Sequence, residues 1–245
     1  MIEVGGSEMN NKELIVKNDY ESISTYAASL IENIITNLNK KIINIALSGG
    51  NTPKLMFEKL SKSTIIDWKY VNIFIVDERH INNNHNDSNS KLIKEVLIDK
   101  IDIPKSNFHI VKYFDDPYKS LKNYKDDISS HFNIESKLYT PKFDLIHLGI
   151  GTDGHTASIF PNKNIDHSKL LDISQGDKYK RITFTYRLLN NSDNIIFLVS
   201  GNKKANIMEK VYNNKADLPA MKINNEGSIY YLLDNYAAKR IKIKK

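Results

Sequence analysis

The chain has 245 residues, of which 40% are hydrophobic and 26% are charged, and its formal net charge is +6. This size and composition favour one large α/β domain, or one domain with an appended lobe, and exclude a membrane-spanning chain, because no apolar run approaches the roughly 20 residues that cross a bilayer. Cysteine is absent, which excludes disulfides, thiolate metal sites and a cysteine nucleophile.

The charge does not predict a nucleic-acid partner. The lysines are scattered among acids and asparagines, without the arginine-rich stripe and interleaved aromatics that follow a phosphate backbone. No secretory signal is readable in residues 1–10. We therefore expect a cytoplasmic protein that binds neither nucleic acid nor a membrane.

Strands and helices alternate along most of the chain. In chain order the pattern predicts a helix at 20–39, strand 42–47, helix 52–60, strand 71–76, helices 91–98 and 118–132, strands 143–150, 181–185 and 194–200, helix 203–212, strand 228–233 and helix 235–241. Such alternation is typical of a mostly parallel sheet covered by helices, a three-layer Rossmann-like α/β sandwich. We expect a flexible extension at 1–14, a single domain at 15–241 and a basic tail at 242–245.

The first candidate site follows the strand at 42–47. In Ser48-Gly49-Gly50-Asn51-Thr52-Pro53, Thr52 suits a helix N-cap and Pro53 the first helical position. The glycines allow several backbone N–H groups to point at one anion, such as a phosphate. The alternative is an ordinary capped turn. The lysine of a nucleotide P-loop is absent, which disfavours ATP and GTP.

The second candidate site is Asp77-Glu78-Arg79, directly after the strand at 71–76. If the chain stays extended, Asp77 and Arg79 lie on the same side, so that Arg79 can offer its forked donors to a polar substrate. The alternative is a solvated rim of charges.

The third candidate site ends the strand at 143–150, in Gly151-Thr152-Asp153-Gly154-His155. Open α/β sheets place ligands at the carboxyl ends of their strands, and the turn would leave His155 there to exchange a proton near neutral pH. Alternatively, His155 only caps or packs. His147, within the strand, is expected to be a core histidine.

Two further cations are candidates for binding an anion. Lys204 stands in the first turn of a predicted helix, where a positive charge opposes the helix dipole. Arg181 opens a predicted strand. The alternative for each is an ordinary surface position.

In series, these segments resemble the 6-phosphogluconolactonases, within the wider group that includes glucosamine-6-phosphate deaminases. The matching pieces span about 15–238: 47–53, Trp68, 76–79, His85-Asn-Asp-Ser-Asn89, 148–161, 181–183, 201–205, 218–220 and 234–238. Deaminases resemble one another in two features that this chain lacks. They carry an Asn-Glu-Pro ending after Asp-Gly-His, where this chain has Ser158-Ile-Phe-Pro161, and a Tyr where it has Arg79. Ser90 departs from the Tyr that is usual in lactonases.

The resemblance implies hydrolysis of 6-phospho-D-glucono-1,5-lactone to 6-phosphogluconate, without a metal or cofactor. His155 would be the general base, oriented by Asp153 or Asp77. Arg79 or N–H groups of the 151–156 turn would stabilise the oxyanion. Ser48, Gly49, Gly50, Asn51 and Thr52, with Arg181 and Lys204, would hold the phosphate, and His85 would shape the rim.

Two other functions and one partner remain open. The chain could be an amino-sugar phosphate deaminase or isomerase, or a non-catalytic sugar-phosphate sensor. Lactonases of this family are sometimes fused to glucose-6-phosphate dehydrogenase, so we also consider a covalent fusion to that enzyme or an association with it.

Overall fold

The computed structural model describes residues 11–136, 138–213 and 216–242. Its centre is a seven-stranded sheet in the order β1-β10-β9-β6-β2-β3-β5, and every neighbouring pair is parallel. The strands are β1 (Lys12–Lys17), β2 (Ile43–Leu47), β3 (Val71–Ile75), β5 (Phe108–His109), β6 (Phe143–Leu148), β9 (Ser192–Val199) and β10 (Ser228–Asp234). The expected mostly parallel sheet is confirmed.

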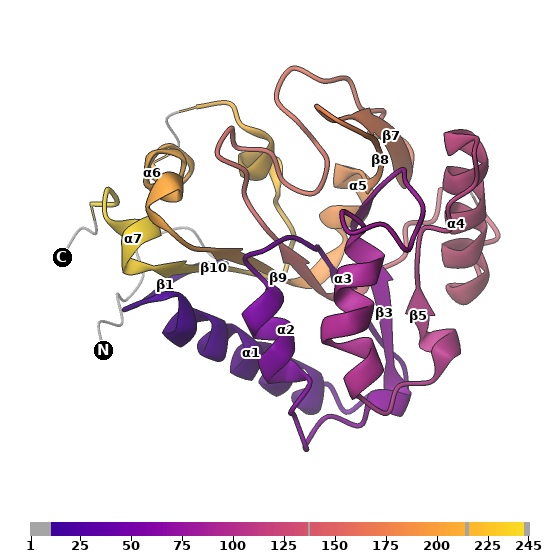
Figure 1. The fold of residues 1–245 in the computed structure, drawn as a ribbon, viewed down its shortest axis with the longest axis horizontal. Coiled ribbons are helices and arrows are strands. Elements are labelled where there is room, and N and C mark those ends of the chain that lie inside the picture. Colours follow the sequence, from indigo (N-terminus) through magenta and orange to yellow (C-terminus); the bar gives the residue numbers. More distant parts are fainter. Residues whose placement is uncertain (1–10, 137, 214–215, 243–245) are drawn as a thin grey trace.

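Helices cover both faces of this sheet, as Figure 1 shows. One face carries α1 (Tyr20–Asn37), α2 (Lys54–Leu60) and α3 (Asn89–Val96), and the other carries α4 (Pro117–His131), α5 (Tyr186–Leu189), α6 (Ala205–Tyr212) and α7 (Asn235–Ala238). Each face has its own hydrophobic core. In β9, Ile196 and Leu198 pack in the core under α1, α2 and α3, while Ile195 and Phe197 pack in the core on the opposite face. A strand segment buried on both faces is apolar, which is why residues 195–199 of β9 form a continuous hydrophobic run.

A smaller antiparallel sheet, in the order β4-β8-β7, was not predicted. Its strands are β4 (Asp77–Arg79), β7 (Leu171–Gln175) and β8 (Lys180–Phe184). The chain passes from β3 into β4 through Val76, whose carbonyl accepts a hydrogen bond from Phe184 N–H at 2.9 Å. The register sets Arg79 opposite Arg181, so the small sheet brings together two cations that are distant in the sequence.

The order of the large sheet explains where a ligand can bind. β2 lies between β3 and β6, so the chain leaves β2 toward one edge of the sheet and later returns on the other side. Such a reversal leaves a crevice at the carboxyl ends of the strands. The segments after β2, β3, β6 and β9 all meet there.

At the amino-terminal end, one predicted boundary is wrong. Lys12 to Leu14 were expected in a flexible extension, but they belong to β1, which pairs with β10 along its whole length. This edge strand has only three consecutive apolar residues, 14–16, too short a run to mark a strand, so pairing with β10 rather than local pattern determines it. Residues 1–10 and 243–245, which carry the rest of the expected extension and most of the basic tail, lie outside the described residues.

Five short 3₁₀ helices complete the described elements. They are Trp68–Tyr70, Ile98–Lys100, Lys105–Asn107, Asn202–Lys204 and Pro219–Lys222. Among the residues that the structure describes, no helix combines the length and apolar character that a bilayer crossing needs.

Candidate active site

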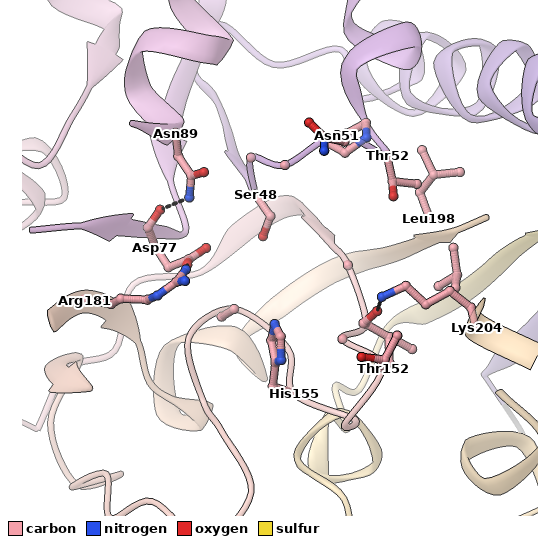
Figure 2. A pocket seen from close by; sticks show the side chains of 18 of the residues that line it. Ser48, Asn51, Thr52, Asp77, Asn89, Thr152, His155, Arg181, Leu198 and Lys204 are labelled. Carbon is pink, nitrogen blue, oxygen red and sulfur yellow. Dashed lines mark hydrogen bonds and ion pairs between the residues drawn. The ribbon is translucent and has the colours of Figure 1, made fainter. Parts of the chain in front are cut away.

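A cavity of about 300 Å³ opens at the carboxyl ends of β2, β3, β6 and β9 (Figure 2). This volume is at the lower end of the range usual for small-molecule sites. The cavity brings together most of the residues expected from the sequence: Ser48, Gly49, Gly50, Asn51, Thr52, Asp77, Arg79, His155, Arg181 and Lys204. Asp153 is not part of its wall and stands behind His155.

The turn after β2 presents unpaired backbone donors to this cavity. Within the described residues, no acceptor is found for the N–H groups of Gly49–Thr52. Ser48 differs, because its N–H already bonds the carbonyl of His147 at 3.1 Å. Gly50 has a φ of 107°, a left-handed conformation that glycine adopts without strain. The turn therefore sets four N–H groups without an acceptor in the described structure along the cavity wall, where an anion can accept hydrogen bonds from them.

The helix that follows this turn starts later than the sequence predicted. α2 begins at Lys54, Pro53 occupies the N-cap position, and no side chain caps the helix. The expected Thr52 cap is wrong. Instead, the Thr52 carbonyl accepts a hydrogen bond from the Tyr20 hydroxyl at 2.9 Å. That bond ties the turn to α1, an arrangement that local pattern alone cannot predict.

His155 is oriented by Asp153. Its Nδ1 lies 2.6 Å from Asp153 Oδ1, and its backbone N–H donates to the same oxygen at 3.1 Å. Partial burial raises the pKa of Asp153, but its bonds to the backbone and imidazole of His155 outweigh this effect and leave the pKa lowered. An ionised carboxylate at Nδ1 holds the proton there and leaves the lone pair on Nε2.

Asp77 serves other partners, although the sequence left it as a second candidate for orienting His155. It is buried, accepts a hydrogen bond from Ser158 Oγ at 2.5 Å and lies 3.9 Å from Arg181. The carboxylate is thus positioned to hold the arginine, and Asp153 is the one in contact with the imidazole.

The two expected phosphate ligands enter the cavity from opposite sides in Figure 2. Arg181 is mostly buried, and burial lowers its pKa while Asp77 opposes that change. Its buried Nε has no hydrogen-bond partner among the described residues. Lys204 donates to the Ile150 carbonyl, and burial lowers its pKa against a smaller opposing effect of Asp153.

Arg79 has a fixed position in the cavity wall. Its Nη1 donates to Asn89 Oδ1 at 2.6 Å and to the Asp87 carbonyl at 2.9 Å. In the described part of the chain, no hydrogen bond is found from its other guanidinium nitrogens. These remaining donors are available to a ligand.

The alternative oxyanion donors, in the 151–156 turn, are partly occupied. Gly151 N–H bonds the His155 carbonyl at 2.8 Å, Gly154 N–H bonds the Gly151 carbonyl at 3.0 Å, and His155 N–H bonds Asp153. These three N–H groups therefore stabilise the turn itself and are not free to bind an oxyanion.

Sequence reasoning gave no role to several residues that support the site. Asn89 lines the cavity, Glu78 is buried beneath Arg79, and Ser158 bonds Asp77. The Phe160 ring centroid lies 4.7 Å from that of His155 and 5.5 Å from the Arg181 guanidinium carbon. All were within matching motifs, but their contacts depend on which strands lie side by side.

The other two histidines named from the sequence lie away from the cavity wall. His147 is fully buried and packs edge-on against Phe57, as a core histidine should. His85 lies in the loop before α3, where its Nδ1 accepts the Asp87 N–H at 3.0 Å. Its ring packs edge-on against Tyr179, in the hairpin between β7 and β8, and its expected place at the rim stays a prediction.

Residues 18–231 match the family model described as glucosamine-6-phosphate isomerases/6-phosphogluconolactonase. A 6-phosphogluconolactonase from Synechocystis sp. is 35% identical over 81% of this chain and 84% of its own length.

Two solved structures have the same fold. The crystal structure of 6-phosphogluconolactonase from Thermotoga maritima has a TM-score of 0.80 with 30% identity, over 91% of this chain and 99% of that one. A monomeric glucosamine-6-phosphate deaminase also has a TM-score of 0.80, but with 18% identity, over 93% of this chain and 99% of that one. The fold alone therefore does not distinguish the two activities.

Proposed function

The chain belongs to the glucosamine-6-phosphate isomerase/6-phosphogluconolactonase family, and we propose that it is a hydrolase that converts 6-phospho-D-glucono-1,5-lactone to 6-phospho-D-gluconate in the oxidative pentose phosphate pathway. The relatives with 30–35% identity that are named 6-phosphogluconolactonase support this substrate. The observation that carries the mechanism is one cavity with unpaired backbone donors at one end and an oriented imidazole at its wall.

The phosphate of the substrate binds at the turn after β2. The N–H groups of Gly49–Thr52 donate to its oxygens, and Arg181 and Lys204 supply positive charge from either side. Arg181 contributes from the cavity wall, where Asp77 lies 3.9 Å from its guanidinium. Anchoring the phosphate converts binding energy far from the reacting carbon into orientation at that carbon.

His155 then activates water. With its proton held on Nδ1 by Asp153, Nε2 accepts a proton from a water molecule whose oxygen attacks the lactone carbonyl carbon. The negative charge that develops on the carbonyl oxygen is stabilised by the free donors of Arg79. The bond between that carbon and the ring oxygen breaks, the imidazolium returns its proton to the ring oxygen, and the new acid loses a proton to solvent.

The nearest rival function is deamination or isomerisation of an amino-sugar phosphate. That chemistry uses an additional carboxylate after the Asp-Gly-His segment, where this chain has Phe160. The aromatic ring there packs on His155 and the guanidinium of Arg181 and offers no acid or base. A non-catalytic sensor would not need an imidazole oriented by a carboxylate.

The decisive assay uses freshly generated phosphogluconolactone and couples the 6-phosphogluconate formed to its dehydrogenase. We expect hydrolysis well above the spontaneous rate, and no ammonia from glucosamine 6-phosphate. Ammonia release would instead support a deaminase, and binding of sugar phosphates with neither reaction would support a sensor.

His155→Ala is expected to lose about 10²–10⁴-fold of the enzymatic rate, because it removes the general base. Affinity for 6-phosphogluconate should change little, since the phosphate donors remain. The rate and the affinity are measured by the coupled assay and by calorimetry. His85→Ala, at the rim, is the matched control and should keep most of the activity. A His155→Ala enzyme as fast as the wild type would refute this role.

Association with glucose-6-phosphate dehydrogenase and a cytoplasmic location complete the proposal. Association with the dehydrogenase would pass a short-lived lactone directly to its hydrolase. The cytoplasmic location is supported by the absence of cysteine, since disulfides are typical of secreted proteins. Co-purification with that dehydrogenase and fractionation of the source cells test the two points.

A further inference from the structure

Glu78 is a buried carboxylate whose two oxygens are both fully engaged. It is 1% exposed. Oε1 accepts the backbone N–H groups of Arg79 and Asn89, each at 2.8 Å. Oε2 accepts Ser88 Oγ at 2.9 Å, Ser90 N–H at 2.7 Å and Ser90 Oγ at 2.6 Å. Burial raises the pKa of Glu78, and the donors of Ser90, Asn89 and Ser88 oppose that change.

These bonds join β4 to the start of α3. Arg79 belongs to β4, whereas Asn89 and Ser90 are the first residues of the helix, whose N–H groups have no partner within it. The carboxylate satisfies both helix N–H groups and an Arg79 N–H at once. It therefore fixes the distance between the strand that carries Arg79 and the helix that carries Asn89.

Asn89 transmits this position to the site. Its Oδ1 accepts Arg79 Nη1 at 2.6 Å, and its Nδ2 donates to the Asp77 carbonyl at 2.7 Å. A Cβ added at Gly49 would lie 2.3 Å from Asn89 Oδ1, so the same amide packs tightly against the turn after β2. Both the proposed oxyanion donor and the proposed phosphate turn thus rest on Asn89.

Ser90 takes part directly in this arrangement. It stands where related lactonases usually have Tyr, and its short hydroxyl donates to Glu78 Oε2. Its backbone N–H donates to the same oxygen. In this chain, the departure from the family pattern supplies one more donor to the buried carboxylate.

We propose that Glu78, with Ser90 as its additional donor, is a positioning residue that fixes Arg79 and Asn89 against the substrate. This inference rests on the proposed function for the reaction in which Arg79 acts. Glu78 itself has no contact with the cavity, because it is absent from the residues that line it. Its effect passes through Asn89 and the guanidinium of Arg79.

The kinetic test compares Ser90→Ala and Glu78→Gln with the wild type. Ser90→Ala should lower kcat about tenfold with little change in KM. Glu78→Gln should lower kcat about 10–100-fold, because in either orientation its amide NH₂ meets a backbone N–H that now lacks an acceptor, and small displacements of catalytic groups cost this much. Ser192→Ala removes a buried hydroxyl at the opposite end of the sheet, where it bonds the Leu189 carbonyl, and should leave kcat unchanged.

A double-mutant cycle separates positioning from general destabilisation. In an Arg79→Ala background, adding Ser90→Ala should lower kcat by less than twofold, because the guanidinium through which Glu78, Ser90 and Asn89 act on kcat is gone. A full tenfold loss in that background would overturn the inference. Equal kcat for Ser90→Ala and the wild type would also overturn it.

A third measurement does not depend on the reaction. ¹⁵N relaxation of the Arg79 guanidinium Nε–H should report an ordered side chain in the wild type and a more mobile one in Ser90→Ala and Glu78→Gln. An Arg79 equally ordered in all three contradicts the positioning role, whichever substrate the enzyme uses. Absence of lactonase activity in the wild type, with the Arg79 order still lost in the variants, would refute only the proposed function.

Discussion

The contact between His155 Nδ1 and Asp153 resolves, in geometry, an ambiguity that spacing left open. Asp153 lies two residues before the imidazole and bonds both its ring and its backbone N–H. Asp77 comes from another strand and is engaged by Ser158 and Arg181. A general base needs one nitrogen fixed and the other free, and Asp153 provides that condition.

Asp153→Asn should lower kcat about 10–100-fold while KM changes little, because the amide no longer stabilises the imidazolium or selects its tautomer. Asp116→Asn is a matched control. Its carboxylate also accepts the N–H two residues ahead, from Tyr118, but it contacts no imidazole. If the two variants retain equal activity, Asp153 does not orient the base.

The proposed role of Lys204 in phosphate binding predicts an affinity that is sensitive to alkaline pH. Burial lowers its pKa, so its charged form is lost at a lower pH than that of an ordinary lysine. Affinity for 6-phosphogluconate should therefore fall as pH rises through that lowered pKa. Lys204→Arg keeps its charge and should move the loss to higher pH. Calorimetry across alkaline pH measures both, and the exposed neighbour Lys203→Arg should leave the profile unchanged. An identical profile for Lys204→Arg would remove Lys204 from the phosphate site.

At the scale of elements, the 149–155 turn positions the imidazole by close packing. A Cβ at Gly151 would lie 2.1 Å from His155 Nδ1 and 2.5 Å from Asp153 Oδ1. Gly151→Ala should therefore push the imidazole away from its carboxylate and lower kcat about 100-fold. A Cβ at Gly149 meets no atom within 4 Å, so Gly149→Ala should keep the thermal unfolding midpoint and the His155 ring NMR signals of the wild type. Unchanged His155 signals in Gly151→Ala would contradict this account.

The buried parallel strands could be predicted because burial on both faces requires mostly apolar residues. β2, β3, β6 and β9 are mostly apolar, and the glycine-rich or polar segments after them were expected at one edge of the sheet. β5 has two residues, and β7 mixes Leu171 and Ile173 with three polar residues, so neither has a readable period. The small sheet exists because β4 and β8 pair, a long-range event.

The supporting contacts of the site were beyond prediction for the same reason. The sequence located the candidate residues, most of them just after an apolar strand, but not their partners. That Glu78 bonds Ser90, or that Phe160 lies between His155 and Arg181, depends on how strands and loops pack. Thr52 shows the converse case: it has a good local cap signal, but the helix begins one residue later and the Thr52 carbonyl instead accepts a hydrogen bond from Tyr20.

At the scale of the whole molecule, a buried neutral histidine beneath the site makes stability fall in acid. Burial lowers the pKa of His147 to about 3, against a small opposing effect of the Ser48 backbone. An unfolded histidine has a pKa of about 6.5. Between these values the unfolded chain binds a proton that the native chain does not, so the free energy of unfolding decreases as pH falls below about 6.5.

His147→Leu removes this titration and keeps apolar bulk. From pH 7.5 to pH 5, the wild type should lose on the order of 2 kcal/mol more unfolding free energy than the variant. Urea unfolding at both pH values measures the difference. Burial also lowers the pKa values of His131 and His167, but both residues are present in the two proteins, so their effects on the unfolding free energy cancel in the comparison. Parallel losses in the two proteins would show that His147 does not titrate in this way.

The most direct test of the account is a crystal structure with 6-phosphogluconate in the cavity. We predict that the phosphate oxygens accept hydrogen bonds from N–H groups of Gly49–Thr52, with Arg181 and Lys204 beside them. The carboxylate at the other end should lie within about 3.5 Å of His155 Nε2. A phosphate bound against His155, or a carboxylate far from it, would contradict the central claim that one cavity joins an anion anchor to an activated imidazole.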